Sequence, residues 1–209
     1  MVQYVYVVDH DRDVRRSTSL LLRVEGFDCR SFGSGLDFLD SLSELKAGVI
    51  LMELRNPEID GFEMMGALRK RGIDWPVIAM TGEADVRVAV SAMKRGAIDV
   101  IVKPFGKDLL IEALANALPE LSVITEKARR RDTAKAKIDS LSPRELEVLR
   151  CLIEGLSNKA IAHRLGLSIR TVEMHRARLM QRLQVNGLAG ALAIAIDAGL
   201  ELISSQEAA

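Results

Sequence analysis

Residues 50–61 read ILMELRNPEIDG, an apolar run that ends on the carboxylate of Glu53 and is followed by a loop rich in turn residues. Similar apolar or β-branched runs recur along the first half of the chain, with segments of helical spacing between them. These runs are YVYVV (4–8), FDCRS (27–31), GVILM (48–52), PVIAM (76–80) and VIV (100–102). Continuous apolar strands that alternate with helices predict a five-stranded parallel sheet covered on both faces, in a doubly wound α/β domain.

The composition excludes some classes of protein. The chain has 209 residues with 29 basic and 29 acidic side chains, so the total charge does not indicate bulk nucleic-acid or membrane binding. No apolar run approaches the roughly 20 residues of a transmembrane helix. The start, MVQYVYVVDHDRD, lacks the basic region that precedes the apolar part of a secretory signal. The two cysteines, Cys29 and Cys151, are interpreted as reduced core thiols, and we expect a cytoplasmic location without membrane contact.

Changes of pattern predict the domain organisation. We expect the α/β domain to span 1–118, with Pro119 at the end of its last helix. The charged segment 119–140 is predicted to be a helical linker. Two interpretations remain open for the apolar residues around this junction, which either form a seam between two chains or pack one helix end. These residues are Leu114, Leu118, Leu121 and Ile124.

Residues 141–209 have the pattern of four short helices. Ser142-Pro143-Arg144-Glu145 is a capping box with proline at the first helical position. Further helices are predicted at Asn158–Leu165, Ile169–Leu183 and Leu188–Ala198. Because Gly166 makes a short turn between two helices of which the second is basic, the arrangement indicates a helix-turn-helix.

One short stretch carries a charge imbalance in this otherwise neutral chain. Residues 158–182 contain six lysines and arginines but a single acid, Glu173. Any one of these arginines could be an ordinary surface charge. The group together favours an interface for phosphates.

Polar residues follow four of the predicted strands at the point where each strand ends. They are Asp9, His10 and Asp11 after the first strand, Glu53 after the third, Thr81 after the fourth and Lys103 after the fifth. In a doubly wound sheet, ligands bind at the carboxyl ends of the strands. We therefore expect acids, a hydroxyl and an ammonium group to converge on one edge of the sheet.

These residues lie in motifs that resemble a known family. The stretches VVDHD (7–11), LMELRNPEIDG (51–61), MTGEAD (80–85) and VKPF (102–105) are similar to response-regulator receiver domains, over residues 1–118. The stretch LSPRELEVLRCLIEGLSNKAIAHRLGLSIRTVEMHRARLMQRL (141–183) resembles LuxR-type DNA-binding domains. Together they resemble a two-component response regulator of the FixJ/NarL type. The resemblance implies a flavodoxin-like receiver followed by an all-α four-helix domain, in a sequence-specific transcription regulator that is not an enzyme.

The resemblance also implies a phosphorylation site at the strand ends. In the family an aspartate after the third strand accepts phosphate, two acids after the first strand hold Mg²⁺, and a hydroxyl and a lysine bind the phosphoryl oxygens. Asp9, Thr81 and Lys103 match this pattern. Glu53 stands in place of the accepting aspartate, and His10 stands in place of the second acid. Valine, at Val100, replaces the aromatic residue that normally swings inward.

These replacements predict that ordinary phosphorylation is lost. Mg²⁺ prefers hard oxygen ligands, so His10 should weaken or remove the metal site, and no cofactor is expected. Our hypothesis is that Glu53 imitates the phosphorylated state, held by Thr81 and Lys103. The first alternative is a decayed pocket with Glu53 solvated, which leaves a dimerisation module. Ordinary phosphorylation of Glu53 is the second alternative.

The predicted recognition helix, Ile169–Leu183, has Val172, Leu179 and Leu183 on its inward face. Residues at the start of this helix and on its opposite face are predicted to enter the major groove, and these are Arg170, Thr171, Glu173, Met174, Arg176 and Ala177. By resemblance, Glu173, Met174 and Ala177 face base edges. Phosphate contacts are expected from Lys159, Thr171, His175, Arg178 and Arg182. Glu145 is predicted to be structural, and the resemblance implies that it pairs with a basic residue.

The partners implied are double-stranded DNA, a second copy of the chain and RNA polymerase, whereas a histidine kinase is left open. Three other functions also stay open. The chain could be a conventional regulator that uses another signal, or an interaction protein that sequesters a regulator through receiver dimerisation. A residual phosphatase-like activity is the third, although no metal site is predicted to support it.

Overall fold

The computed structural model describes residues 3–82 and 85–200 of the chain. The chain divides into two compact units, Met1–Thr125 and Glu126–Ala209. Helix α5 (Lys107–Asp139) contributes its first part to the first unit and its last part to the second. Of the MTGEAD motif, residues 83–84 lie outside the described residues.

The first unit is built on a five-stranded sheet with the order β2-β1-β3-β4-β5. All neighbouring strands are parallel. The central strands β3 and β4 are buried along their whole length, as expected for strands covered on both faces. The predicted doubly wound α/β class is therefore confirmed. The strands are β1 (Tyr4–Val8), β2 (Asp28–Phe32), β3 (Val49–Glu53), β4 (Val77–Thr81) and β5 (Asp99–Val102).

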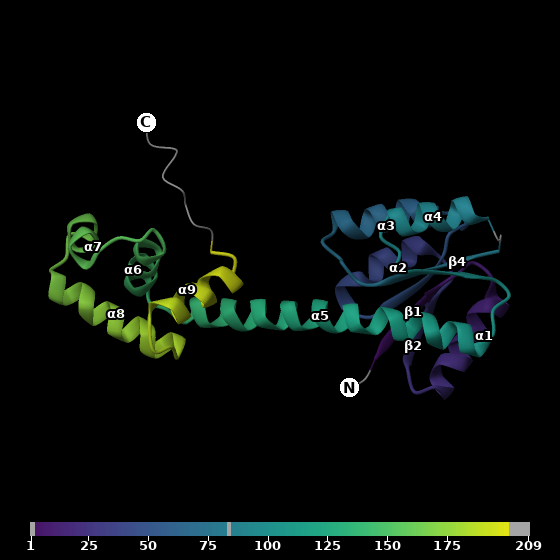
Figure 1. The fold of residues 1–209 in the computed structure, drawn as a ribbon, viewed down its shortest axis with the longest axis horizontal. Coiled ribbons are helices and arrows are strands. Elements are labelled where there is room, and N and C mark those ends of the chain that lie inside the picture. Colours follow the sequence, from purple (N-terminus) through teal and green to yellow (C-terminus); the bar gives the residue numbers. More distant parts are fainter. Residues whose placement is uncertain (1–2, 83–84, 201–209) are drawn as a thin grey trace. The chain divides into compact units, whose positions relative to one another are not determined.

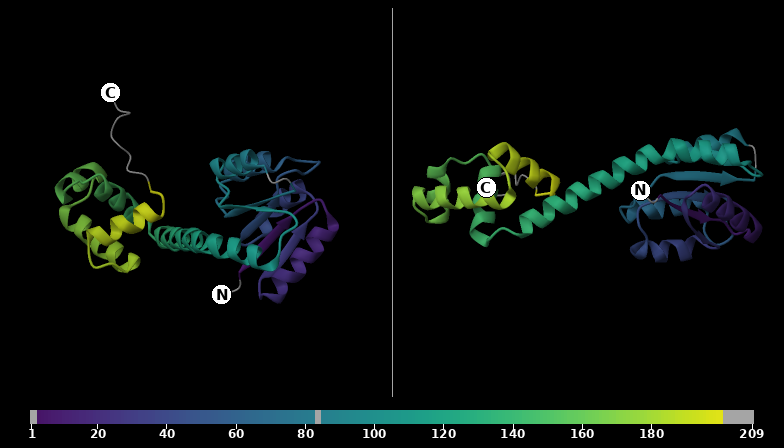
Figure 2. Two further views of the ribbon diagram at one scale, coloured as in Figure 1. Left: turned by 45° about the vertical axis from the view of Figure 1, so that its right-hand side comes forward. Right: turned by 90° about the horizontal axis from the view of Figure 1, so that it is seen from below.

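Helices cover both faces of this sheet (Figures 1 and 2). On one face, α1 and α5 pack over a core that includes Leu22, Leu51 and Leu114. On the other face, α2, α3 and α4 pack over a core that includes Phe38 and Met64. The bounds not yet given are α1 (Arg12–Val24), α2 (Gly35–Ser41), the 3-10 helix η1 (Leu42–Glu44), α3 (Gly61–Lys70) and α4 (Val86–Lys94).

The loop after β3 explains why the stretch ILMELRNPEIDG ends in an aspartate and a glycine, Asp60 and Gly61. The carboxylate of Asp60 accepts a hydrogen bond of 2.7 Å from the N–H of Phe62 and so caps α3. A Cβ atom at Gly61 would lie 2.8 Å from the Cα of Leu54 and 2.9 Å from the carbonyl oxygen of Glu53. Glycine at position 61 therefore lets α3 begin directly against the end of the strand that carries Glu53.

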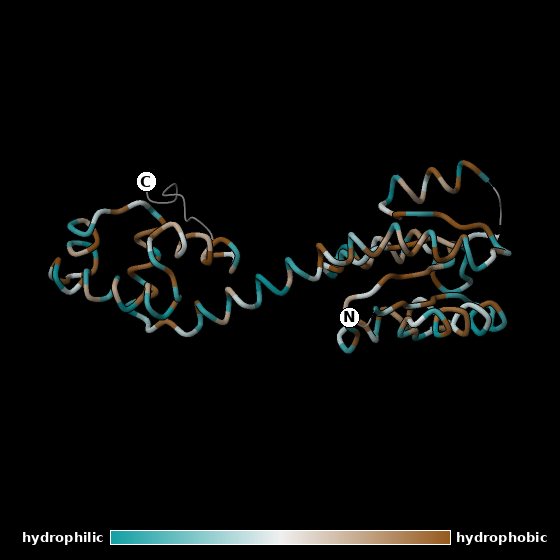
Figure 3. The backbone as a smooth tube through the Cα atoms, turned by 60° about the horizontal axis from the view of Figure 1, so that its bottom comes forward, coloured by the Kyte–Doolittle hydropathy of each residue, from teal (hydrophilic) through white to brown (hydrophobic). Residues whose placement is uncertain are grey.

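The prediction that a helix ends at Pro119 is wrong, because α5 continues through Pro119 to Asp139. Proline removes one hydrogen bond from a helix, since it has no N–H. Packing offsets that loss, because Leu114 and Leu121, on either side of Pro119, are only 0% and 7% exposed in the core of the first unit. For the same reason these two leucines do not form a seam between chains. The linker bounds 119–140 stay a prediction, and the last part of α5 is mostly hydrophilic (Figure 3).

The second unit contains the predicted four short helices. The capping box is confirmed: the N–H of Glu145 donates to Ser142 Oγ (3.3 Å), and the N–H of Ser142 donates to the Glu145 carboxylate (2.8 Å). Gly166 ends a helix with φ of 65°, in the left-handed region that favours glycine. The last helix ends at Asp197, one residue before the predicted Ala198. The helices are α6 (Pro143–Ile153), α7 (Asn158–Leu165), α8 (Ile169–Leu183) and α9 (Leu188–Asp197).

The last turns of α5 belong to the core of this second unit. Ala134 and Ile138 are 4% and 8% exposed, and Ile138 packs with residues of α6, α7 and α8. The ammonium group of Lys137 donates a hydrogen bond of 3.0 Å to the carbonyl oxygen of Leu183. A fragment that contains the whole core must therefore start before Ala134, and residue 126 is the first of the second unit.

Among the described residues, no single helix combines the length and the apolar character needed to cross a membrane, and α8 and α9 meet that test only as a pair bent by 59°.

Candidate functional site

The register of the sheet brings the predicted polar residues to one edge. Val8 lies beside Met52 in the pairing of β1 with β3, and Thr81 lies beside Val102 in the pairing of β4 with β5. The residues that end or follow these strands therefore emerge at the same level. They are Asp9, His10, Glu53, Thr81 and Lys103.

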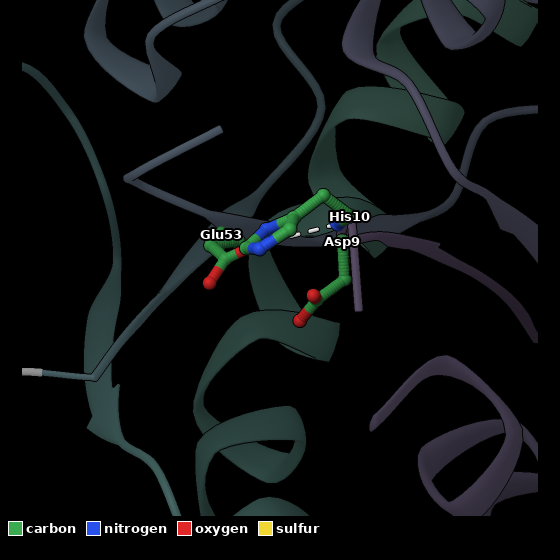
Figure 4. A group of neighbouring side chains, drawn as sticks. All are labelled: Asp9, His10 and Glu53. Atoms are coloured by element: carbon green, nitrogen blue, oxygen red, sulfur yellow. Dashed lines mark hydrogen bonds and ion pairs between the residues drawn. The ribbon is translucent and has the colours of Figure 1, made fainter. Parts of the chain in front are cut away.

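Four of these side chains form a connected network, here called the strand-end cluster: Asp9, His10, Glu53 and Lys103. The ammonium group of Lys103 lies 2.5 Å from Asp9 Oδ2 and 2.7 Å from Glu53 Oε1. The second carboxylate oxygen of Glu53, Oε2, lies 2.5 Å from His10 Nδ1, and Figure 4 shows the imidazole turned toward this carboxylate. Both oxygens of Glu53 are thus engaged, one by an ammonium group and the other by a ring nitrogen.

Burial and hydrogen bonding shift the pKa values of the two carboxylates in opposite directions. Asp9 is 0% exposed and Glu53 is 7% exposed, whereas the side chain of His10 is 47% exposed. Burial raises the pKa of Asp9, and the hydrogen bonds from Lys103 and from the backbone offset this only in part. Burial also acts to raise the pKa of Glu53, but the bonds from Lys103 and His10 outweigh it and hold this pKa below its ordinary value. Glu53 therefore keeps its charge more readily than Asp9.

The loop after β1 is held by bonds that the sequence did not reveal. Nη1 of Arg15 donates to the carbonyl oxygens of Asp9 (2.8 Å) and His10 (2.9 Å). The N–H of Asp11 donates to Asp9 Oδ1 (2.9 Å), and the Asp11 carboxylate caps α1. Arg15 was missed because it is one of several arginines in RDVRR, and no sequence signal sets it apart.

Two further predicted positions lie close to the strand-end cluster. Thr81 is 3% exposed, and its carbonyl oxygen accepts a hydrogen bond of 2.7 Å from the N–H of Lys103. That the Thr81 hydroxyl holds Glu53 stays a prediction. Val100 is partly buried against the core on the α2–α4 face, so an aliphatic side chain occupies this position.

A cavity of about 420 Å³ opens beside the strand-end cluster. His10, Glu53 and Lys103 supply polar groups, and Val14 and Phe105 supply apolar surface. The VKPF motif included Phe105, but its place in this wall depends on how α5 starts, which the motif alone does not give. The cavity leaves the strand-end cluster accessible to small solutes from the side of His10.

In the second unit, α8 has one buried and one open face. Val172, Leu179 and Leu183 are 0% exposed, so the predicted inward face is confirmed. Lys159 of α7 is exposed, as are most of the residues of α8 that are predicted to contact DNA. The exposed residues of α8 are Arg170, Glu173, Met174, Ala177, Arg178 and Arg182, and the partly buried ones are Thr171, His175 and Arg176.

Two of the arginines of α8 also bind other parts of the second unit. Arg176 donates to the side chain of Asn158 on α7. Arg182 Nη1 donates to the carbonyl oxygen of Ser140 (2.7 Å), and its Nε lies 3.3 Å from the Glu145 carboxylate. Together with the capping-box bonds, the charge of Arg182 outweighs burial and lowers the pKa of Glu145. The pairing of Glu145 with a basic residue, implied by the resemblance, is therefore present.

Known proteins share both units. Residues 5–115 match the response regulator receiver domain, and residues 139–195 match the luxR family of bacterial regulatory proteins. The transcriptional regulatory protein FixJ of Bradyrhizobium diazoefficiens is 36% identical, over 94% of this chain and 96% of that protein.

Solved structures agree with these matches. The response regulator StyR has a TM-score of 0.75 and 32% identity, over 94% of this chain and 99% of the other. Full-length FixJ from B. japonicum has a TM-score of 0.56 and 36% identity, over 95% and 98% of the two chains. The chain therefore belongs to the FixJ/NarL family of two-component response regulators, and it is a DNA-binding transcriptional regulator with a receiver domain and a LuxR-type helix-turn-helix domain.

Proposed function

We propose that this regulator binds DNA without being phosphorylated, because Glu53 imitates the phosphorylated state of the receiver. The observation that carries the proposal is the ion pair of 2.7 Å between Glu53 Oε1 and the ammonium group of Lys103. Lys103 corresponds to the lysine that binds the phosphoryl group in the family. An acid at position 53 supplies a permanent negative charge to this lysine.

The burial of Glu53 favours this role over a decayed pocket. A carboxylate that had lost its function would be expected at the solvent, because burying a charge is costly unless it is paired. Glu53 is 7% exposed, and both of its oxygens are bonded. The pairing explains why the chain tolerates this buried charge.

The donor groups also argue against the magnesium site of the family. Mg²⁺ requires near-ideal octahedral coordination by oxygen, and His10 offers nitrogen instead. The ammonium group of Lys103 lies within 2.7 Å of both carboxylates and offsets part of the negative charge that would attract Mg²⁺. Phosphoryl transfer needs a metal ion to offset the developing charge, so we propose that phosphodonors do not modify Glu53.

DNA binding by the full-length chain tests the proposal. A random DNA library is first enriched with the fragment 126–209, which contains the whole core of the second unit. At one fixed salt concentration, wild type should bind the enriched DNA at least as tightly as the fragment. Glu53→Gln keeps the size of the side chain but removes its charge, and it should weaken binding by roughly tenfold, about the worth of one charged hydrogen bond.

The matched control is Glu112→Gln, which removes an exposed carboxylate on α5 of the same unit and should leave binding unchanged. If the full-length wild-type protein does not bind the enriched DNA while the fragment does, Glu53 does not hold the receiver in the state that permits DNA binding. In a second experiment, incubation with acetyl phosphate and Mg²⁺ should give no mass gain of one phosphoryl group. A stable gain on Glu53 would contradict independence from phosphorylation.

We also propose that two copies bind paired half-sites, because dimers of this kind read two-fold related DNA. Helix α9 supports this, since it buries Ala191 and Ala195 but leaves Leu188 and Ile196 36% and 68% exposed. The interaction with RNA polymerase and the cytoplasmic location stay proposals. An interaction protein that acts mainly by receiver dimerisation would keep its effect in cells after Lys159→Ala and Arg178→Ala abolish DNA binding.

A further inference from the structure

We propose that Asp9, His10 and Glu53 form a site for one divalent transition-metal ion of the Zn²⁺ class, in place of the magnesium site of the family. One ligand atom from each residue lies within 4.8 Å of the other two (Figure 4). Asp9 and His10 are adjacent in the chain, and Glu53 faces them from the neighbouring strand β3. This site goes beyond the proposed function, which concerns the metal-free protein, in which Glu53 pairs with Lys103.

The ligand atoms determine which ion is favoured. Two carboxylates and one imidazole form a mixed oxygen and nitrogen set, and imidazole suits Zn²⁺, Cu²⁺, Fe²⁺ or Ni²⁺ much better than Mg²⁺. Three protein ligands with one position left for water are typical of zinc sites that are open to solvent. His10 is the residue whose presence changes the preference, since an acid at the same position would give an oxygen set.

The hydrogen bonds and ion pairs of these three residues leave their ligand atoms able to bind a cation. Asp9 Oδ2 is buried and makes an ion pair with Lys103, but it accepts no well-aligned hydrogen bond among the described residues. His10 Nδ1 and Glu53 Oε2 lie 2.5 Å apart, so a hydrogen bond joins two atoms that could both turn toward one metal ion. An ion would replace this hydrogen bond, and the two atoms would move apart to take their places around it.

The charges of the side chains around the site also favour binding of a cation. Two carboxylates, those of Asp9 and Glu53, share the ammonium group of Lys103. The guanidinium group of Arg15 binds the backbone carbonyl oxygens of Asp9 and His10. A surplus of negative charge therefore remains, which a divalent cation would offset and an anion would increase.

The site is also accessible to ions from the solvent. The side chain of His10 is 47% exposed, and it lines the cavity of about 420 Å³ beside Glu53 and Lys103. An ion can therefore reach the buried carboxylates from the side of the imidazole. On binding, it would compete with the ammonium group of Lys103 for Asp9 and Glu53.

Metal binding to the full-length protein, with any affinity tag removed, tests the site. Zn²⁺ affinity is measured by competition with a chromophoric chelator, Mg²⁺ affinity by calorimetry, and the ligand type from the visible absorption of bound Co²⁺. Wild type should bind one Zn²⁺ and prefer it to Mg²⁺. His10→Ala should weaken Zn²⁺ binding by at least about tenfold, the lower range for losing even an indirect partner of a metal.

A second variant tests the selectivity itself. His10→Asp restores an all-oxygen set, so it should weaken Zn²⁺ binding and strengthen Mg²⁺ binding relative to wild type. The matched control is His163→Gln, which removes an exposed histidine of α7 and should change neither affinity. Circular dichroism verifies that each variant is folded, which is expected because His10 is half exposed.

Three results would overturn the site. Zn²⁺ binding that survives His10→Ala would mean adventitious binding elsewhere. Equal losses in His10→Ala and His163→Gln would indicate nonspecific surface histidines. A wild-type protein that binds Mg²⁺ more tightly than Zn²⁺ would show that the nitrogen ligand does not determine the preference. None of these measurements involves DNA, so they are independent of the role proposed for Glu53.

Discussion

The strand-end cluster and helix α8 use charge in opposite ways. In the cluster, each charged side chain lies within 2.7 Å of a partner, and Asp9, Glu53 and Lys103 are largely withdrawn from water. On α8, Arg170 and Arg178 are exposed and make no ion pair within the described residues. The receiver edge therefore pairs its charged side chains with one another, whereas α8 keeps cations available for the phosphates of another molecule.

This difference shows where each unit is sensitive to mutation. Removing one member of a buried network leaves an unpaired charge inside the protein, which costs folding free energy. Removing an exposed cation changes binding and its salt dependence but leaves the fold intact. The following predictions test this contrast, from the largest expected effect to the smallest.

The largest loss of folding stability is expected for Lys103→Met. The variant removes the cation between Asp9 and Glu53, so two buried carboxylates would face each other with only the bond from His10 to Glu53 left. Breaking a buried ion pair by removing one partner typically costs about 3–5 kcal/mol. Urea unfolding of the full-length protein, followed by the fluorescence of Trp75 in the first unit, measures the loss.

Lys107→Met is the matched control. Lys107 lies in the same unit and pairs with Glu25, but its side chain is 56% exposed. Surface pairs contribute little, so this variant should unfold at nearly the wild-type urea concentration. Equal losses in the two variants would mean that the strand-end cluster behaves as a surface network, and the contrast between the two regions would fail.

The fold was largely predictable, because the strands and the helices of the second unit each have a clear pattern. The prediction failed at Pro119, where proline is a good local signal for a helix end but burial of Leu114 and Leu121 decides the outcome. Local sequence cannot show this, because the packing partners of these leucines come from distant strands.

The candidate site was predictable in its residues but not in its bonds. Strand ends identified Asp9, His10, Glu53 and Lys103, since parallel strands deliver their carboxyl ends to one edge. The pairing of His10 with Glu53 depends on a side-chain rotation that no pattern encodes. Arg15 was missed for the same reason, since its role depends on the path of the loop after β1.

A smaller loss of folding stability is expected when Glu145 is replaced by glutamine, and this loss depends on pH. The pKa of Glu145 in the folded state lies below its ordinary value of 4.5. A lowered pKa means that the ionised form stabilises the fold above pH 4.5 and that this contribution is lost as the pH falls through the folded-state pKa. In fragment 126–209, Glu145→Gln should cost about 1–2 kcal/mol at pH 7, in the range of a lost helix cap.

Urea unfolding of the fragment at pH 7, 5, 4 and 3 checks this prediction. The difference between wild type and Glu145→Gln should shrink as the pH falls through the folded-state pKa of Glu145, because the glutamate side chain then becomes neutral like glutamine. Glu147→Gln is the control, since Glu147 pairs with Arg144 on the surface of the same helix. A difference that stays constant with pH would show that packing, not charge, explains the loss.

The smallest effect on folding, and the sharpest test of the contrast, compares two arginines of α8. Arg178 is exposed and makes no ion pair within the described residues, whereas Arg182 binds Ser140 and Glu145 inside the unit. Arg178→Ala should weaken binding to every DNA sequence and lower the slope of log affinity against log salt by about 1, with unchanged stability. Arg182→Ala should lower the slope less and reduce the urea midpoint of fragment 126–209, because it also removes the partner of buried Glu145. If both variants change the slope equally and neither changes the midpoint, the internal bonds of Arg182 do not hold in solution, and α8 presents both arginines to the phosphates alike.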